Sequence, residues 1–125
     1  MILDTNAISD RYEGTPGLMR HLATAARICL PIPALAEFRF GILKSNRRAS
    51  MEEWYWKGVA TSEVLPVDLQ TAERYAQIRV ILERKGRKIP MNDLWISAIA
   101  LQHNLPVLSR DSHFDVVDGL KRFSW

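Results

Sequence analysis

The 125-residue sequence lacks the features that mark secreted, disulfide-bonded and membrane proteins. Its one cysteine, Cys29, excludes an intramolecular disulfide, and its place in the apolar stretch ICLPI predicts a buried structural thiol in a reducing compartment. The longest apolar stretch, ICLPIPALAEF, contains two prolines and a glutamate and is too short to span a bilayer. An aspartate at position 4 interrupts the start before the apolar region of a signal peptide could form. We therefore expect a cytoplasmic protein with no membrane segment.

Histidine is also scarce. His21, His103 and His113 are too far apart to show the spacing of a zinc site, so we expect each to be structural or on the surface, although His113 lies close to Asp111. The net charge of +3 and the pI near 9.3 are compatible with a polyanionic partner without selecting one. The length and the 47% apolar content predict one domain over residues 1–125 with its own core.

What the sequence does contain is a series of short apolar runs separated by longer helical patterns. MILD, RICLPI, SEVLPV and LPVLS are rich in Ile, Leu and Val and do not alternate with polar residues, which is typical of buried parallel strands. Five helices are expected over residues 16–27, 33–44, 47–62, 68–86 and 92–104, the last two capped by Asp68 and Asn92. This order predicts an α/β fold, a three-layer α/β/α sandwich around a mainly parallel sheet.

Most of the acidic residues have a structural explanation on a solvated helix face, at a cap or in a turn, but four do not. Asp4 and Asp111 follow the first and the last expected strand, at the sheet edge where α/β proteins bind ligands, although Asp4 alone could be a helix cap. Glu37 lies in PALAEFRFGIL, an apolar helix in which a buried, unpaired carboxylate costs several kcal/mol. Asp93 opens NDLWISAIAL, where an acid complementing the helix dipole is the simpler interpretation.

Brought together, four carboxylates would repel one another strongly unless divalent cations lay between them. Oxygen ligands without a cluster of His or Cys favour Mg²⁺, or Mn²⁺, over zinc. One or two such ions can activate water and stabilise the leaving oxygen in phosphodiester hydrolysis. The acids therefore suggest a metal-dependent hydrolase.

Four motifs, LDTN, LAEFRFGI, NDLWISAIA and LSRDSHFDVVDGL, together resemble the PIN-domain nucleases, most closely the VapC toxins of bacterial toxin–antitoxin modules. The resemblance covers essentially the whole chain. It implies a Mg²⁺-dependent endoribonuclease that cuts tRNA or rRNA, leaves a 5′-phosphate and a 3′-hydroxyl, and inhibits translation. It also implies a homodimer and a hetero-oligomer with a cognate VapB-type antitoxin.

By position, the resemblance assigns four acids both to catalysis and to the metal site: Asp4, Glu37, Asp93 and Asp111. Supporting hydrogen bonds would come from Thr5, Asn6 and Ser109, and Arg110 would lie near a substrate phosphate. The sequence departs from the family pattern at Asp115, an extra acid that leaves open which residue fills the fourth position. We prefer Asp111 because it directly follows the strand.

Two further segments have open interpretations. Arg87 and Lys88 in ERKGRK lie beyond the helix end, so they either contact RNA phosphates or are simply solvated. In RRASMEEWYWK, Trp54 and Trp56 belong to the core, to a dimer or antitoxin contact, or to a surface that stacks on RNA bases.

Two alternative functions remain at this point. A haloacid-dehalogenase-like phosphatase also has an aspartate after its first strand, but it needs a second acid two residues later, where this sequence has Asn6. A non-catalytic RNA-binding or scaffold PIN-like domain would be expected to lack one or more of the four acids, and none is missing.

Overall fold

A computed structural model describes all residues, 1–125, and its centre is a five-stranded parallel sheet in the order β3-β2-β1-β4-β5. The strands are short: β1 (Ile2–Leu3), β2 (Cys29–Pro31), β3 (Glu63–Leu65), β4 (Val107–Leu108) and β5 (Arg122–Phe123). The strand order reverses between β1 and β4. In open α/β sheets, this reversal is where the carboxyl ends of two strands leave room for a ligand site.

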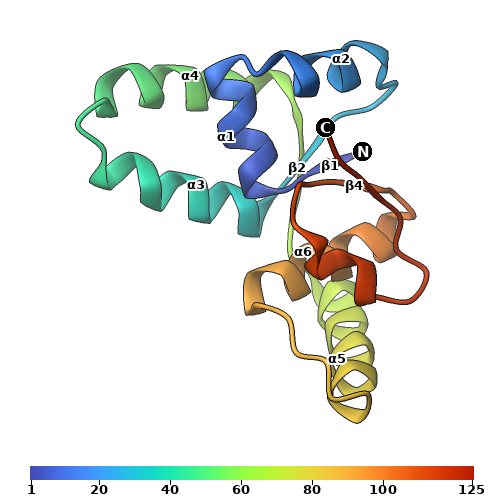
Figure 1. Ribbon diagram of the computed structural model, residues 1–125. Helices are drawn as coiled ribbons and strands as arrows, with labels where there is room; N and C mark the ends of the chain where they lie inside the picture. Colours follow the sequence, from blue (N-terminus) through green and yellow to red (C-terminus); the bar gives the residue numbers. More distant parts are fainter.

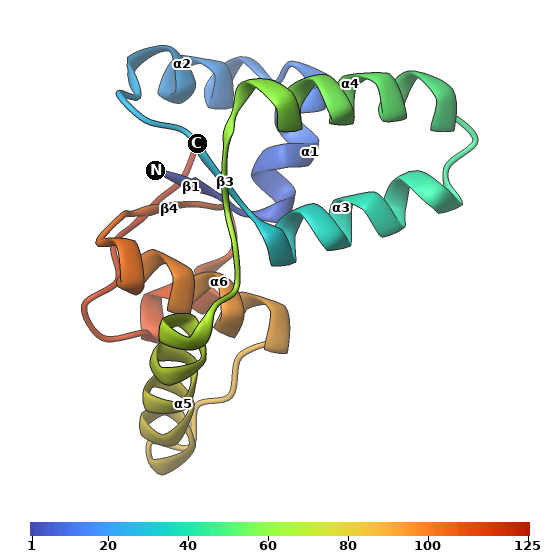
Figure 2. The ribbon, with the colours of Figure 1, turned by 180° about the vertical axis from the view of Figure 1, so that it is seen from behind.

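Six α-helices and one 3₁₀ helix surround the sheet: α1 (Thr5–Glu13), α2 (Pro16–Thr24), α3 (Ile32–Lys44), α4 (Arg48–Thr61), α5 (Leu69–Arg84), α6 (Met91–His103) and η1 (Ser112–Val116). Helices α1 to α4 lie on one side of the sheet, and α5, α6 and η1 on the other (Figures 1 and 2). The expected three-layer α/β/α fold is therefore confirmed. The last strand predicted from the sequence, in LPVLS, is β4. The structure adds β5 after it, which was not predicted.

The five expected helices are present with ends shifted by no more than three residues. Helix α1 was not predicted, because only Ala7 and Ile8 of its nine residues are buried and the apolar pattern is too short to recognise. Helix α1 is instead defined by the capping residues at its two ends. The Asp4 carboxylate caps its first turn, and Gly14, with φ of 72°, ends it in a left-handed conformation that favours glycine.

Two hydrophobic clusters hold these layers together. The larger contains 21 buried residues from β1 to β4, α1 to α4, one face of α6 and η1, and includes Cys29, which is fully buried as expected. The smaller cluster lies where α5, α6 and the end of η1 meet, and consists of Ile78, Leu82, Leu94, Ala98 and Val117. Helix α6 therefore packs on both sides. None of the helices combines the length and apolar character needed to cross a bilayer.

Candidate active site

Asp4 lies at the strand reversal, directly after β1, and has two roles there. As the N-cap of α1, its Oδ1 accepts a hydrogen bond of 2.7 Å from the backbone N of Thr5. The residue is only 4% exposed, so its carboxylate is also buried. Asp4 is therefore a helix cap, and its carboxylate is also buried at the strand reversal.

The second oxygen of Asp4 is held by side chains from both sides of the strand reversal. Its Oδ2 accepts hydrogen bonds from Asn6 Nδ2 at 2.9 Å and from Ser109 Oγ at 2.7 Å. Ser109 is fully buried after β4, and its Oγ accepts from the backbone N of Asp111 at 2.9 Å. The loop that carries Asp111 is thus tied to the first acid through a single hydroxyl.

Glu37 does not lie where the sequence predicted. Helix α3 was expected to be largely buried, but Glu37 is exposed, because the helix buries one face only. On the other face of α3, three apolar side chains are exposed to solvent: Ile32, Phe40 and Leu43. Glu37 nevertheless reaches the site, since its Oε2 accepts hydrogen bonds from Thr5 Oγ1 at 3.1 Å and Asn92 Nδ2 at 2.5 Å.

The expected cap role of Asn92 is wrong. Helix α6 begins at Met91 with Pro90 in the N-cap position, so Asn92 already lies in the first turn. Its side-chain amide donates to the carbonyl oxygen of Pro33 at 3.2 Å as well as to Glu37. Asn92 therefore fixes the start of α6 against α3, a function that its position in the sequence did not reveal.

Asp93 and Asp111 meet at His113, a residue expected only to be structural or on the surface. The His113 Nδ1 atom lies 2.9 Å from Asp93 Oδ2 and 2.9 Å from Asp111 Oδ1. One ligand atom from each of the three residues falls within 4.8 Å of the others. The one signal in the sequence was the position of His113 two residues after Asp111, in the segment that forms η1.

The electrostatics of the site reflect crowded negative charge. The pKa of Asp93 is raised to about 6, chiefly by burial and also by the charges of Asp4 and Asp111, while the hydrogen bond from His113 opposes the rise. Burial also raises the pKa of Asp4, with a contribution from Glu37 and Asp111, against the hydrogen bonds from Ser109 and Thr5. The hydrogen bond to Asp93 raises the pKa of His113. A cation among these groups would relieve the repulsion.

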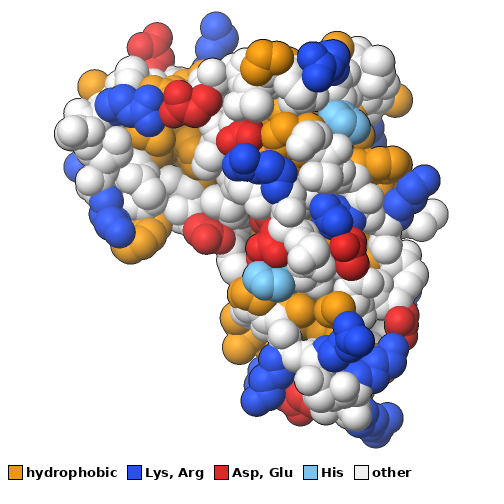
Figure 3. Space-filling model, in the orientation of Figure 1, with side chains coloured by type: hydrophobic (Ala, Val, Ile, Leu, Met, Phe, Trp, Pro, Cys, Tyr) orange, Lys and Arg blue, Asp and Glu red, His pale blue; other side chains and the backbone are white.

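The donor atoms suit a divalent cation. Glu37 Oε1, Asp93 Oδ1 and Asp111 Oδ2 accept no hydrogen bond from the protein, so each keeps its lone pairs free. Carboxylate oxygens are the preferred ligands of Mg²⁺, and an added imidazole nitrogen is well tolerated by Mn²⁺. Figure 3 shows acidic side chains gathered beside a histidine in the middle of one face, with Lys and Arg above and below them.

Two charged residues near Asp111 in the sequence, Arg110 and Asp115, have other partners. Arg110 directs its guanidinium to Asp10, with Nη2 3.2 Å from Oδ1, and its backbone N donates to Asn6 Oδ1 at 3.2 Å. Asp115 forms a two-pronged pair with Arg122 at 2.7 and 2.8 Å. Because Asp115 is explained by that ion pair, the geometry favours Asp111 as the fourth acid.

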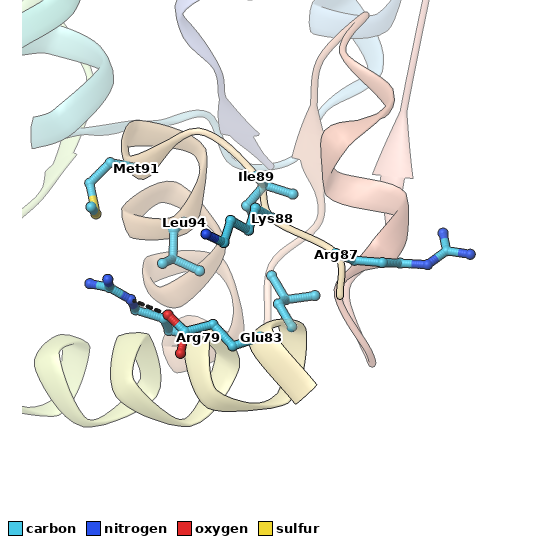
Figure 4. Close-up of a pocket in the computed structure, with 8 residues that line it drawn as sticks. Arg79, Glu83, Arg87, Lys88, Ile89, Met91 and Leu94 are labelled. Carbon is cyan, nitrogen blue, oxygen red and sulfur yellow. Dashed lines mark hydrogen bonds and ion pairs between the residues drawn. The ribbon is translucent and has the colours of Figure 1, made fainter. Parts of the chain in front are cut away.

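Arg87 and Lys88 lie apart from the acids. They line a hollow between α5 and the start of α6, together with Arg79, Glu83 and Met91, and none of the four acids contributes to it. Figure 4 shows Arg87 extending away from the hollow while Lys88 lies beside Leu94. The two cations thus point in different directions and form no single phosphate site.

The two tryptophans of α4 also differ from each other. Trp54 packs against the larger core cluster, where its ring meets those of Tyr12 and Phe38. Trp56 is 57% exposed beside the guanidinium of Arg39. Only Trp56 has a ring available to a partner.

Comparison with known proteins places these features in a family. A PIN domain family model matches residues 1–120. The ribonuclease VapC5 of Mycobacterium tuberculosis is 37% identical over 100 residues, which cover 74% of this chain and 70% of that protein. The toxin FitB of Neisseria gonorrhoeae is 30% identical over 122 residues, covering 90% of this chain and 88% of that protein.

The solved structures give the same result. The DNA-bound VapBC complex from Salmonella typhimurium contains a chain that matches with a TM-score of 0.89 and 27% identity. The match covers 99% of this chain and 96% of that chain. It therefore extends over the sheet and both groups of helices.

Proposed function

The chain belongs to the PIN domain family, and on that basis we propose that it is a Mg²⁺-dependent endoribonuclease, the toxin of a VapBC-type module. The observation that carries the proposal is the meeting of Asp4, Glu37, Asp93 and Asp111 at the strand reversal. These acids come from four separate parts of the chain, and the charges of three of them act on the pKa of Asp4 or Asp93. A metal-dependent phosphodiesterase accounts for all four together.

In this proposal Glu37, Asp93 and Asp111 hold Mg²⁺, or Mn²⁺, through the carboxylate oxygens that accept no hydrogen bond. Asp4 contributes through the remaining lone pair of Oδ1, which accepts one hydrogen bond, from Thr5. A bound divalent cation activates water for in-line attack on phosphorus and stabilises charge on the leaving oxygen. Asn6 and Ser109 keep the Asp4 carboxylate fixed and favour its ionised form by donating to Oδ2. Thr5 and Asn92 orient the Glu37 carboxylate by donating hydrogen bonds to its Oε2.

Asp93 and His113 supply the proton acceptor. Their side chains share a hydrogen bond between Oδ2 and Nδ1 at 2.9 Å, so a carboxylate and an imidazole, two groups that commonly act as general bases, lie together. A proton released by the attacking water can pass to this pair. The products would be a 5′-phosphate and a 3′-hydroxyl.

The names of the relatives support a proposal for the substrate and the partners. We propose that residues 1–125 form a single PIN domain that cuts tRNA or rRNA in the cytoplasm and inhibits translation. A cognate VapB-type antitoxin would bind it, and the active form would be a homodimer within a toxin–antitoxin hetero-oligomer. The support is that similar proteins are named ribonuclease and toxin, and that one was crystallised as a VapBC complex.

Of the three cations considered for RNA contact, Arg110 is the strongest candidate. It lies between Ser109 and Asp111, and its side chain is 54% exposed. Lys88 and Arg87 lie in or beside the separate hollow, so they would contact phosphates farther along the strand, if the RNA follows α6. The phosphatase alternative is set aside, because Asn6 serves Asp4 as a hydrogen-bond donor and the chain belongs to another family.

The test is mapped cleavage of total bacterial RNA by the purified protein in Mg²⁺, Mn²⁺ or EDTA. Wild type should cut at defined positions only with a metal. Asp4→Asn and Asp93→Asn should each reduce the rate at least about 100-fold, because each loses a charged ligand. Asp115→Asn is the matched control and should retain activity, since Asp115 pairs with Arg122 outside the cluster. Cleavage that persists in EDTA, or in both acid variants, would refute the metal mechanism.

A further inference from the structure

Arg110 joins the loop after β4 to α1 at two points, in addition to the contacts of Ser109 with Asp4 and Asn6. Asn6 Oδ1 accepts from the Arg110 backbone N, and Asp10 Oδ1 accepts from its guanidinium, each at 3.2 Å. Because Asn6 and Asp10 are four residues apart, they lie on one face of the helix. Asp10, which holds the guanidinium, is therefore about 6 Å farther along α1 than Asn6, the residue that contacts Asp4.

Trp125 completes this arrangement from the other end of the sequence. Its indole Nε1 donates to Asp10 Oδ2 at 2.9 Å, and the Arg110 guanidinium carbon lies 5.3 Å from a ring centroid of Trp125. The indole packs on Gly17 of α2, where an added Cβ would approach Trp125 Cδ1 to 3.4 Å. Asp10 thus uses one oxygen for Arg110 and the other for Trp125, and its side chain is only 15% exposed.

The contacts with Asp10 and Trp125 keep the Arg110 guanidinium away from the four carboxylates. Arg110 is next to Asp111 in sequence, and a free guanidinium beside four carboxylates would turn toward them and occupy the position of a cation. Asp10 offers a competing carboxylate, and the Trp125 ring offers a surface on which the guanidinium can lie. Asp10 takes one of its N–H donors, so the remaining donors can bind a phosphate in the fork geometry that arginine prefers.

We propose that Asp10 and Trp125 are positioning residues that hold Arg110 ready to bind an RNA phosphate adjacent to the scissile one. The inference rests on the proposed ribonuclease function and adds to it two residues outside the acidic cluster. Holding the side chain in place before RNA binds reduces the ordering cost that a flexible arginine would otherwise incur. The expected signature is a change in KM rather than in kcat.

The other end of α1 provides a matched control. Arg47 Nη2 lies 2.8 Å from Glu13 Oε1, and its guanidinium carbon is 5.4 Å from the Tyr12 ring centroid. This arginine has the same type of acidic and aromatic neighbours as Arg110. It lies in the connection between α3 and α4, which Figures 1 and 2 both place far from α6 and η1. Arg47→Gln should therefore leave RNA kinetics unchanged.

The experiment measures kcat and KM on an RNA oligonucleotide containing the mapped cleavage site, over a range of KCl concentrations. Arg110→Gln should raise KM about 10-fold with kcat nearly unchanged, because one charge-assisted phosphate contact is lost. The slope of log(kcat/KM) against log[K⁺] should become shallower by about 0.7, the value for one phosphate on a single strand. Thermal unfolding of each variant confirms that the fold is retained.

Asp10→Asn and Trp125→Phe test the positioning itself. Each should raise KM by about 3- to 5-fold, and neither should have a further effect in the Arg110→Gln background. A solely structural role predicts additive effects and an unchanged salt slope, which would overturn the inference. So would a lower KM in Asp10→Asn, because loss of a negative charge near RNA would then matter more than the position of Arg110.

The two proposals fail in different ways. If wild type does not cleave RNA with any metal, the proposed ribonuclease function is refuted, and the proposed role of Asp10 and Trp125 is refuted with it. If wild type cleaves but Arg110→Gln behaves like Arg47→Gln, only the positioning inference is refuted.

Discussion

The two buried acids of the site are held in contrasting ways. Asp4 accepts three hydrogen bonds, from Thr5, Asn6 and Ser109. Asp93 accepts one side-chain hydrogen bond, from His113, and its pKa is raised to about 6. The carboxylate of Asp4 is thus part of the architecture that joins β1, α1 and the loop after β4. The carboxylate of Asp93 is held loosely, so its protonation state and its ligand can change.

This contrast predicts opposite effects on stability when each charge is removed. Asp4→Asn replaces an acceptor by an amide that faces two donors, so the free energy of unfolding should fall by about 1–3 kcal/mol. Asp93→Asn removes a buried charge that repels Asp4 and Asp111, so stability at pH 7 should rise by an amount on the order of 1 kcal/mol. Chemical denaturation in EDTA measures both. A fall of the same size in both variants would show that the two acids are held alike.

The contrast also predicts how stability depends on pH and metal. The native pKa of Asp93 is raised from 3.8 to about 6, so the native state binds more protons than the unfolded state in this range. Stability of the metal-free protein should therefore fall as pH rises from about 4 to 6. It should fall further above pH 6.5 as His113, whose pKa is also raised, loses its proton.

Metal binding should reverse this loss. At 100 times its dissociation constant, Mn²⁺ should add about 2.7 kcal/mol to the free energy of unfolding at pH 7.5. His113→Asn should reduce the stabilisation by Mn²⁺ more than that by Mg²⁺, because an imidazole nitrogen suits Mn²⁺ better. Thermal unfolding with each metal makes the comparison, and equal reductions would exclude His113 as a ligand.

Stability should also depend on the hydroxyl of Ser109, which ties Asp4 to the loop. Ser109→Ala removes a donor to Asp4 and leaves the backbone N of Asp111 without its acceptor, so stability should fall by about 1–2 kcal/mol. Ser97→Ala is the control, because the buried Ser97 donates only to the backbone carbonyl of Asp93, at 2.7 Å. If the denaturation curves shift equally for both variants, the hydrogen bond between Ser109 and Asp4 adds no stability beyond that of an ordinary buried serine.

The sequence revealed the parts of the site that depend on local position. Asp4 and Asp111 were found because each follows a buried strand, and the parallel sheet brings strand ends together. Glu37 was selected for a reason that proved wrong, since it is exposed rather than buried. Its location near the site depends on the angle at which α3 leaves β2, which no local pattern encodes.

The residues that were missed all act through contacts between distant parts of the chain. Asn92 reaches α3 across 55 residues, His113 reaches Asp93 across 20, and Trp125 reaches Asp10 across 115. Each has an ordinary local interpretation as a cap, a surface side chain or a packing residue. β5 was missed for a related reason, because two half-buried residues form a strand only by pairing with β4.

The brevity of the strands has a consequence for how such a protein can diversify. Only two residue pairs, Ile2 with Val107 and Leu3 with Leu108, align β1 with β4 and so set Asp4 opposite Ser109. The helical hairpins α3–α4 and α5–α6 project away from that junction (Figures 1 and 2). Their tips can lengthen, shorten or exchange surface side chains without shifting this alignment. Recognition can therefore evolve in the projecting tips while the chemistry stays fixed at the junction.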